Sequence, residues 1–121
     1  MDTRTKILTA AAARRIAPPV AMATGFFDVL RAEHLRELSA LKSNGALLVA
    51  VLPLAGELLD QRSRAELVAG LRMVDYVVAA DRGDVDALID ALKPLHLARL
   101  ETADARRARQ LTEHVQRRQS G

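Results

Sequence analysis

Short apolar runs alternate with amphipathic segments along the chain, and this alternation is its most informative pattern. The run ALLVAVL at residues 46 to 52 is almost entirely apolar, which is typical of a parallel strand buried on both faces. Three other short runs have a similar character and lie between amphipathic segments. The pattern therefore predicts four strands, at residues 20 to 25, 46 to 52, 75 to 80 and 95 to 100.

The segments between these runs predict helices. Leucines recur on one side of residues 33 to 42, and Asn44-Gly45 then provides a typical helix end. Residues 64 to 73 are expected to form a second helix. Asp84 is expected to cap a third, whose apolar positions fall at i, i+3, i+4 and i+7: Val85, Leu88, Ile89 and Leu92.

Two further helices are expected at the ends of the chain. Residues 3 to 17 predict a helix, which Pro18-Pro19 separates from the first strand, and Thr102 is expected to cap a last helix that runs to about residue 118. Strands that alternate with helices of this length indicate βαβ units and a parallel sheet. The sequence therefore predicts a helical lead-in at residues 1–19, followed by one α/β domain at residues 20–121.

Charge adds little to this picture because the basic excess is local. The net charge of +3 arises from residue 99 onward, where six arginines face three acidic residues. A docked helix with a solvated arginine face is the simplest interpretation, and a nucleic-acid surface is the alternative. With one tyrosine and two phenylalanines, the chain offers no stacking platform for single strands, so we do not expect a nucleic-acid partner.

Composition also limits the other classes of partner and site. The chain has no cysteine, and its three histidines, His34, His96 and His114, share no metal-ligand spacing, so we expect no structural metal. No apolar run approaches the roughly 20 residues that cross a bilayer. The N-terminal apolar run precedes its arginines, which is the reverse of a signal peptide. We therefore expect a cytoplasmic protein without membrane contact.

The loop at residues 24 to 34 is the candidate site. It joins the first predicted strand to the next helix, so it lies at the carboxyl end of a parallel strand, where ligands of such sheets bind. Gly25 would let the backbone approach a phosphate, and amides at the start of the following helix could donate to it. The alternative is an ordinary strand-to-helix turn.

This loop resembles the signature of the cytidylyltransferase-like nucleotidyltransferases, which runs Gly-x-Phe-Asp-x-x-His-x-Gly-His. Here residues 25 to 34 read GFFDVLRAEH. The segment Arg72-Met73-Val74-Asp75 also resembles the Arg-x-Val-Asp sequence of that family, and the opening TKILT resembles the lead-in of the adenylyltransferase domain of ADP-heptose synthases. Glycerol-3-phosphate cytidylyltransferase is a further relative. The resemblance implies a small doubly wound, Rossmann-like parallel sheet of about four strands in the order 3-2-1-4, with helices on both faces.

The family transfers a nucleotidyl group from a nucleoside triphosphate to a phosphate-bearing alcohol or sugar. The resemblance therefore implies a nucleotide or phosphate-bearing ligand, with Mg²⁺ and CTP or ATP as the cofactor. It gives catalytic roles to His34 and to Arg31, which replaces the first histidine. The residues implied in nucleotide binding are Gly25, Phe26, Phe27, Asp28, Lys42 and Arg64. Relatives commonly dimerise around the Arg-x-Val-Asp segment, so Arg72, Val74 and Asp75 are expected at a homodimer interface.

Departures from the signature weaken the expected catalysis. Arg31 cannot copy the geometry of an imidazole, and Glu33 places a carboxylate where the family has glycine. The phosphate-gripping motif that relatives carry near the C-terminus is also absent from the sequence. The leading hypothesis is a divergent domain with a vestigial pocket and weak or no nucleotidyl transfer. The alternatives are a non-catalytic module that regulates a sugar-nucleotide or cell-envelope precursor enzyme, and an active cytidylyl- or adenylyltransferase.

Overall fold

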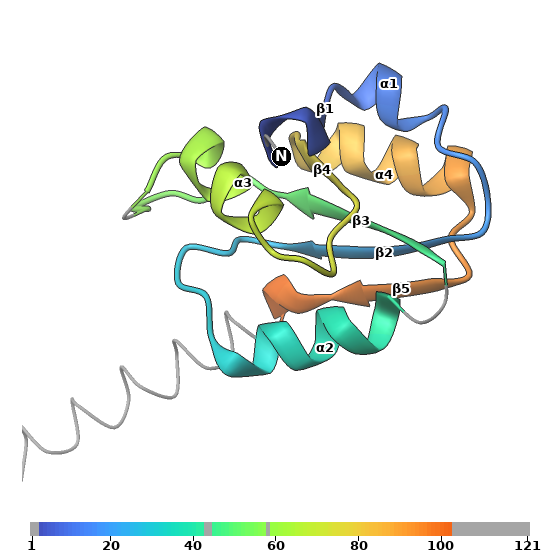
Figure 1. The fold of residues 1–121 in the computed structure, drawn as a ribbon. Helices are drawn as coiled ribbons and strands as arrows, with labels where there is room; N and C mark the ends of the chain where they lie inside the picture. The colour runs from blue at the N-terminus through green and yellow to red at the C-terminus, as the bar shows by residue number, and fades with distance from the viewer. Residues whose placement is uncertain (1–2, 43–44, 58, 103–121) are drawn as a thin grey trace, which may run out of the picture.

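The computed structural model describes residues 3–42, 45–57 and 59–102. Its centre is a parallel sheet of five strands in the order β1-β4-β3-β2-β5 (Figure 1). Four of them are the predicted strands in the predicted order 3-2-1-4: β2 (Val20–Gly25), β3 (Ala46–Val51), β4 (Tyr76–Ala79) and β5 (His96–Arg99). The α/β fold class is therefore confirmed, and the sheet has one strand more than expected.

The fifth strand comes from the segment where one helix was predicted. Instead of a helix over residues 3 to 17, the chain forms a 3-10 turn (Thr3–Lys6), the short strand β1 (Ile7–Leu8) and the short helix α1 (Ala10–Ala13). β1 pairs with β4, with Ile7 opposite Val77. Thr9 caps α1 by accepting a hydrogen bond from the backbone N–H of Ala12. Because Ile7 and Leu8 are apolar neighbours, they suit the two faces of a strand, a signal hidden by the alanines that follow.

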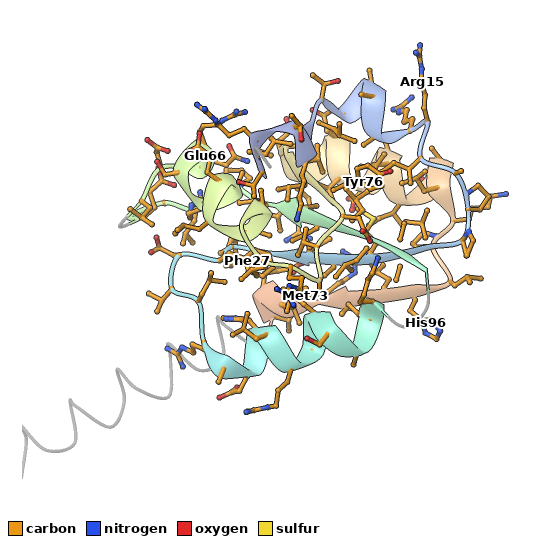
Figure 2. The ribbon with its side chains drawn as sticks, in the orientation of Figure 1. Arg15, Phe27, Glu66, Met73, Tyr76 and His96 are labelled. Atoms are coloured by element: carbon orange, nitrogen blue, oxygen red, sulfur yellow. The ribbon has the colours of Figure 1, made fainter. Side chains whose placement is uncertain are left out.

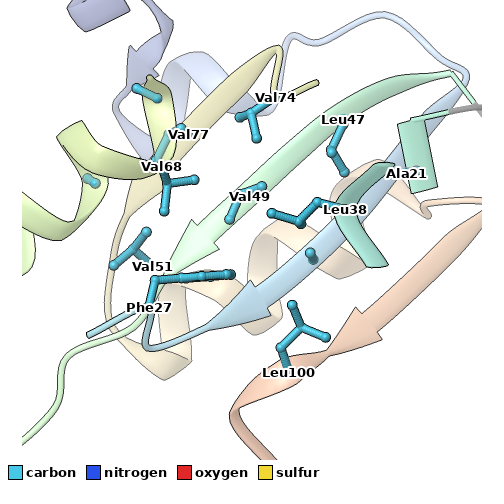
Figure 3. Close-up of a cluster of buried hydrophobic side chains, with 13 residues drawn as sticks. Ala21, Phe27, Leu38, Leu47, Val49, Val51, Val68, Val74, Val77 and Leu100 are labelled. Atoms are coloured by element: carbon cyan, nitrogen blue, oxygen red, sulfur yellow. The ribbon is translucent and has the colours of Figure 1, made fainter. Parts of the chain in front are cut away.

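Helices cover both faces of the sheet, as Figure 1 shows. α2 (Ala32–Lys42) and α3 (Gln61–Ala69) lie on one face, and α1 and α4 (Arg82–Leu92) lie on the other. Successive residues of β3 alternate between the two faces. Leu47, Val49 and Val51 pack toward α2 and α3 (Figure 3), whereas Leu48 and Ala50 pack toward α1 and α4. This period of two divides the apolar strands between two cores.

Two helix starts differ from the sequence prediction because the capping aspartates lie earlier. α4 is capped by Asp81 rather than Asp84, and the Asp81 carboxylate accepts a hydrogen bond of 2.8 Å from the backbone N–H of Asp84. α3 begins at Gln61, three residues before its predicted start, because Asp60 caps it in the same way through Ser63.

The chain is already helical at residues 100 to 102, and the rest of the predicted last helix lies outside the described residues.

The strand order creates a switch point between β2 and β5. The chain leaves β2 toward α2 on one face, and it reaches β5 from α4 on the other face. In open parallel sheets, such a point opens a crevice at the carboxyl ends of the two strands, where ligands bind.

Within the described ranges, no helix has the length and apolarity needed to cross a membrane.

Candidate functional site

Gly25 ends β2 and makes room for an aromatic ring. A Cβ at this position would lie 2.8 Å from the ring of Phe27 and 3.4 Å from Cβ of Leu100. Phe27 itself is buried and has a φ of 54°, an unusual left-handed conformation for a bulky residue. The glycine therefore serves the packing of this turn, which brings Phe27 back over the sheet (Figure 3). A phosphate contact is not needed to account for it.

His34 lies in the first turn of α2 and is fixed by two contacts. Its Nδ1 accepts a hydrogen bond of 3.0 Å from the backbone N–H of Arg31, and its ring packs against Phe27 with centroids 5.7 Å apart. Only 5% of the residue is exposed. Because Nδ1 is an acceptor here, the neutral ring carries its proton on Nε2. The structure therefore holds the retained histidine of the signature in one orientation and one tautomer.

The two substituted positions of the signature lie on the outer side of the same turn. Arg31 is exposed, and its backbone N–H donates the hydrogen bond to His34. Glu33 is half-buried in the first turn of α2. A carboxylate in a first turn is favoured by the helix dipole, but it also occupies the end of the helix that would otherwise attract an anion.

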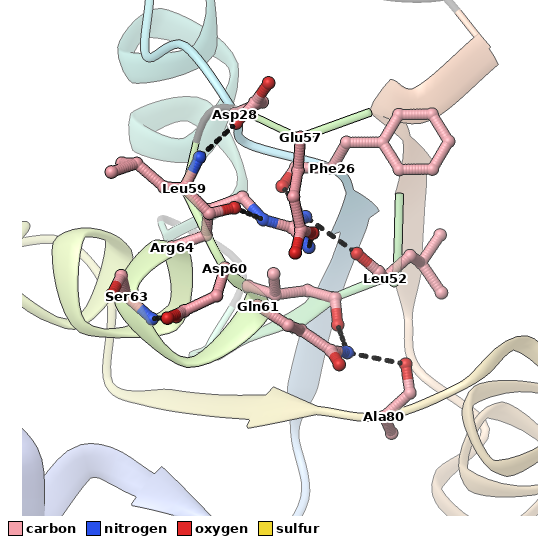
Figure 4. A network of polar contacts seen from close by, with 11 residues as sticks. Phe26, Asp28, Leu52, Glu57, Leu59, Asp60, Gln61, Ser63, Arg64 and Ala80 are labelled. Carbon is pink, nitrogen blue, oxygen red and sulfur yellow. Dashed lines mark hydrogen bonds and ion pairs between the residues drawn. The ribbon is translucent and has the colours of Figure 1, made fainter. Parts of the chain in front are cut away.

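Arg64 is completely buried and joins three segments at the carboxyl edge of the sheet (Figure 4). Its Nη1 donates to the carbonyl oxygens of Phe26 at 2.6 Å and Leu52 at 2.8 Å. Its Nε donates to the carbonyl of Leu59 at 3.1 Å, and its Nη2 pairs with the carboxylate of Glu57 at 2.7 Å. These contacts are called the Arg64 network below. The network directs the guanidinium toward the protein's own backbone.

Two further bonds hold the same loops together. Asp28 accepts a hydrogen bond of 3.2 Å from the backbone N–H of Leu59, which links the signature loop to the segment before α3. Gln61 donates from Nε2 to the carbonyls of Val51 at 2.9 Å and Ala80 at 3.3 Å, which links the ends of β3 and β4. Phe26 and Asp28, both expected in nucleotide binding, therefore make structural contacts within the chain.

Lys42 does not lie near the other expected binding residues. It is the last residue of α2, and its ammonium pairs with the carboxylate of Asp75, which also accepts a 2.8 Å bond from the backbone N–H of Leu47. Leu47 is near the start of β3. This pair thus lies at the amino ends of the strands, whereas the signature loop lies at their carboxyl ends.

The three residues expected at a dimer interface have different environments. Val74 is 1% exposed and belongs to the core beneath α2 and α3. Asp75 is partly exposed and is bonded within the chain, whereas Arg72 is exposed. Of these three residues, only Arg72 has a side chain that is mainly open to solvent.

A buried polar cluster at the switch point was not anticipated from the sequence. Thr24, fully buried at the end of β2, donates from Oγ1 to the Glu101 carboxylate at 2.7 Å. Arg82, in the first turn of α4, donates from Nη1 to the other oxygen of that carboxylate at 3.0 Å. Glu101 follows directly after the predicted strand at residues 95 to 100, and this position was the available signal.

Metal-binding side chains do not converge in the same way. Across residues 3–42, 45–57 and 59–102, no group of three or more His, Asp or Glu side chains could hold a metal ion. A magnesium ion at this edge would therefore depend on oxygens of a bound phosphate group as well as on the protein.

Comparisons with known proteins agree with this architecture. No protein-family model matches the chain. The bifunctional protein HldE of Geobacter metallireducens is 36% identical over 90 residues, which are 66% of this chain and 18% of the relative. HldE of Geobacter sulfurreducens is 34% identical over the same shares. The chain therefore spans about a fifth of the length of these curated relatives.

The fold is also similar to that of a solved structure. The lipopolysaccharide core biosynthesis protein of Thermoplasma volcanium has a TM-score of 0.58 and 29% sequence identity, over 64% of this chain and 70% of that one. Three observations point to the same family: the strand order, the position of the retained His34 at the start of α2, and the similarity to these relatives. The similarity to these proteins supports the cytidylyltransferase-like superfamily of nucleotidyltransferases as the family of this chain.

Proposed function

We propose that this protein is a divergent nucleotidyltransferase-like domain that binds a nucleotide or another phosphate-bearing molecule weakly and has little or no transferase activity. The observation that carries the proposal is the fixed orientation of His34 at the carboxyl edge of the sheet. An imidazole held through Nδ1 directs its proton-bearing Nε2 as a donor, which suits a phosphate oxygen. The start of α2 adds backbone amides next to it.

The groups around His34 favour weak binding. The guanidinium of Arg64 is committed to three carbonyls and Glu57, so a triphosphate could recruit it only by breaking the Arg64 network. Arg31 is exposed and could turn toward a ligand, but its longer side chain differs from the histidine it replaces. Glu33 adds negative charge. A carboxylate about 4 Å from a phosphate costs on the order of 4 kcal/mol at an effective dielectric constant near 20.

Magnesium and a nucleoside triphosphate fit these residues only in part. His34 and the first amides of α2 could hold one phosphate group, and the metal would supply charge neutralisation between phosphate oxygens. The lysine expected to help is at the opposite edge of the sheet, where Lys42 pairs with Asp75. We therefore propose binding of one or two phosphate groups rather than the full grip on a triphosphate that transfer needs.

Calorimetric titration tests this proposal. We expect CTP or ATP with Mg²⁺ to bind the unaltered protein weakly, and we expect His34→Ala to abolish the heat of binding while leaving the far-UV circular dichroism unchanged. Arg36→Ala, an exposed substitution on the same helix, is the matched control and should bind like the unaltered protein. Equal binding by all three proteins would refute a site at His34.

Turnover is a separate measurement. Removing one preorganised donor at a developing charge costs about 10²- to 10³-fold in rate, and here several are replaced or directed elsewhere. We expect no pyrophosphate release from CTP or ATP with glycerol phosphate or a sugar phosphate as acceptor. Release above that of His34→Ala would show that the second alternative, an active cytidylyl- or adenylyltransferase, is correct.

An interaction module is the second candidate function, and the exposed edge of the sheet favours it. β5 is an outer strand, and the neighbouring Leu95 and Leu97 are 66% and 37% exposed. His96 points outward between them (Figure 2). Open strand edges of this kind pair readily with other chains. In this role, the protein would regulate an enzyme of sugar-nucleotide or cell-envelope precursor synthesis.

We also propose that the protein forms a homodimer in the cytoplasm. The support for a dimer is the open edge at β5, with the exposed Arg72 as a second contact candidate. The support for the location is functional, since nucleoside triphosphates are cytoplasmic metabolites. Fractionation of the source cells would test the location, and recovery of the protein outside the cytoplasm would contradict it.

A further inference from the structure

The polar cluster of Thr24, Arg82 and Glu101 is unusual because its carboxylate is buried at the switch point, where ligands of parallel sheets bind. Glu101 is 5% exposed, Thr24 is fully buried, and the side chain of Arg82 is half exposed. The two donors bind different oxygens of the carboxylate, at 2.7 Å from Thr24 and 3.0 Å from Arg82. Each carboxylate oxygen thus has a donor of its own.

The cluster brings together three elements at the switch point. Thr24 is the next-to-last residue of β2, Glu101 lies shortly after β5, and Arg82 begins α4 after β4. β2 and β5 are neighbours, with Thr24 opposite Arg99. Gly25, the first residue of the signature loop, lies beside Leu100. The carboxylate therefore lies at the carboxyl ends of β2 and β5, beside the start of the loop that holds the proposed phosphate site.

The donors have the chemistry of an anion site. A buried hydroxyl and a half-exposed guanidinium, fixed by a strand end and a helix start, are groups that bind phosphate oxygens. A carboxylate presents two oxygens to them in a similar way. Burial of a carboxylate is costly without such partners, so the pairing also keeps Glu101 in place.

We propose that Thr24 and Arg82 form an anion subsite for a phosphate or pyrophosphate group, and that Glu101 occupies this subsite from within the chain. Bound phosphate and the Glu101 carboxylate exclude each other, because both need the same donors and carry the same sign of charge. Glu101 is thus an autoinhibitory residue. The inference deepens the proposed function and rests on it for nucleotides, but binding of inorganic pyrophosphate tests it independently.

The experiment measures inorganic pyrophosphate binding by calorimetry and by thermal stabilisation of the full chain. Glu101→Gln removes the charge and keeps the shape. Glu66→Gln is the matched control, since it removes an exposed carboxylate that pairs with Arg62 on the same helix. We expect Glu101→Gln to bind pyrophosphate at least tenfold more tightly than the unaltered protein and Glu66→Gln. A unit charge about 4 Å away at an effective dielectric constant near 20 corresponds to roughly a thousandfold, which sets the upper range.

A double variant identifies the donors. Adding Arg82→Ala to Glu101→Gln should remove the gain, whereas a gain that persists without Arg82 would overturn the proposal. Equal binding by Glu101→Gln and Glu66→Gln would also overturn it. Since Glu101 is buried, its variant could lose the fold, and nuclear magnetic resonance of the unaltered protein provides a second test. At tens of millimolar pyrophosphate, the amide signals of Thr24, Arg82 and Glu101 should shift together and saturate, and unchanged signals would refute the subsite.

The outcomes separate this inference from the proposed function. Failure of the proposed function would leave CTP and ATP binding unchanged by His34→Ala. Failure of the subsite would leave pyrophosphate binding unchanged by Glu101→Gln. Stronger pyrophosphate binding in Glu101→Gln without any added affinity for CTP or ATP would support the anion subsite and show that it is separate from the nucleotide site at His34.

Discussion

Arg64→Met is the substitution that most directly tests how the signature loop is held. Arg64 is fully buried, and its guanidinium donates to the carbonyls of Phe26, Leu52 and Leu59 and to the carboxylate of Glu57. Methionine fills much of the same volume without any donor. The variant therefore removes the bonds of the Arg64 network and adds only a small cavity.

The expected loss follows from the groups left without a donor. The carbonyl of Leu52 is in a buried bond, and an unsatisfied buried acceptor costs about 1 to 3 kcal/mol. The carbonyls of Phe26 and Leu59 are partly buried and add less, and Glu57 is one-third exposed, so water can solvate its carboxylate. We expect the free energy of unfolding to fall by about 3 to 5 kcal/mol, the range measured when one partner of a buried pair is removed.

Urea unfolding followed by circular dichroism measures this change. With an m-value of about 2 kcal/mol per molar urea, the midpoint should fall by roughly 1.5 to 2.5 M. Arg62→Met on the same helix is the control. Arg62 is exposed and makes an i,i+4 pair with Glu66, so its loss should change the free energy by less than about 1 kcal/mol. Similar midpoints for Arg62→Met and Arg64→Met would refute the structural role of Arg64 and restore it as a ligand-binding candidate.

Three further predictions concern packing, pH and assembly. Gly25→Ala should lower the free energy of unfolding by about 1 to 3 kcal/mol in urea titrations, because the new Cβ would lie 2.8 Å from the Phe27 ring; an unchanged midpoint would contradict this packing. Hydrogen bonds from the backbone and side chain of Ser63 hold the pKa of Asp60 below its usual 3.8, so the Asp60 carboxylate stabilises the fold above about pH 3.8 and this contribution is lost as the pH falls through its lowered pKa. The melting temperature of the unaltered protein should therefore exceed that of Asp60→Asn at pH 6, and this difference should shrink below pH 3.8; a constant difference would argue against the assignment. Sedimentation equilibrium should give twice the chain mass of 13.2 kDa at tens of micromolar, and a monomer mass would remove the homodimer proposal.

The sequence was sufficient to predict the central strands because their apolar runs are buried on both faces. β2, β3, β4 and β5 lie within one or two residues of their predicted ends and in the predicted order. The missed strand, β1, has only two residues and precedes an alanine-rich stretch whose helical propensity dominates the local pattern. Its conformation depends on pairing with β4, a tertiary contact that local propensity does not contain.

The site was predictable in location but less so in the partners of its side chains. The position of the signature loop follows from the strand that precedes it, and His34 has a defined orientation there. Arg64 was expected in nucleotide binding, yet it is buried among carbonyls of distant segments. Lys42 and Asp75, assigned separately to nucleotide and dimer contacts, pair with each other across 33 positions. Such pairings depend on the three-dimensional approach of the loops, which spacing along one chain does not encode.

The short strand β1 has a consequence for self-association. It pairs with β4, which lies far along the sequence, since Ile7 is opposite Val77. Lys6, next to β1, donates to the carbonyl of Leu71 at 3.2 Å. This edge of the sheet is therefore covered only after distant parts of the chain have met. Until then, the edge of β4, with the buried Val77 and Val78, is open to strands of other molecules. The segment from Thr3 to Leu8 thus covers this edge of β4, and we expect a chain that lacks it to gain an aggregation-prone edge while keeping its central strands.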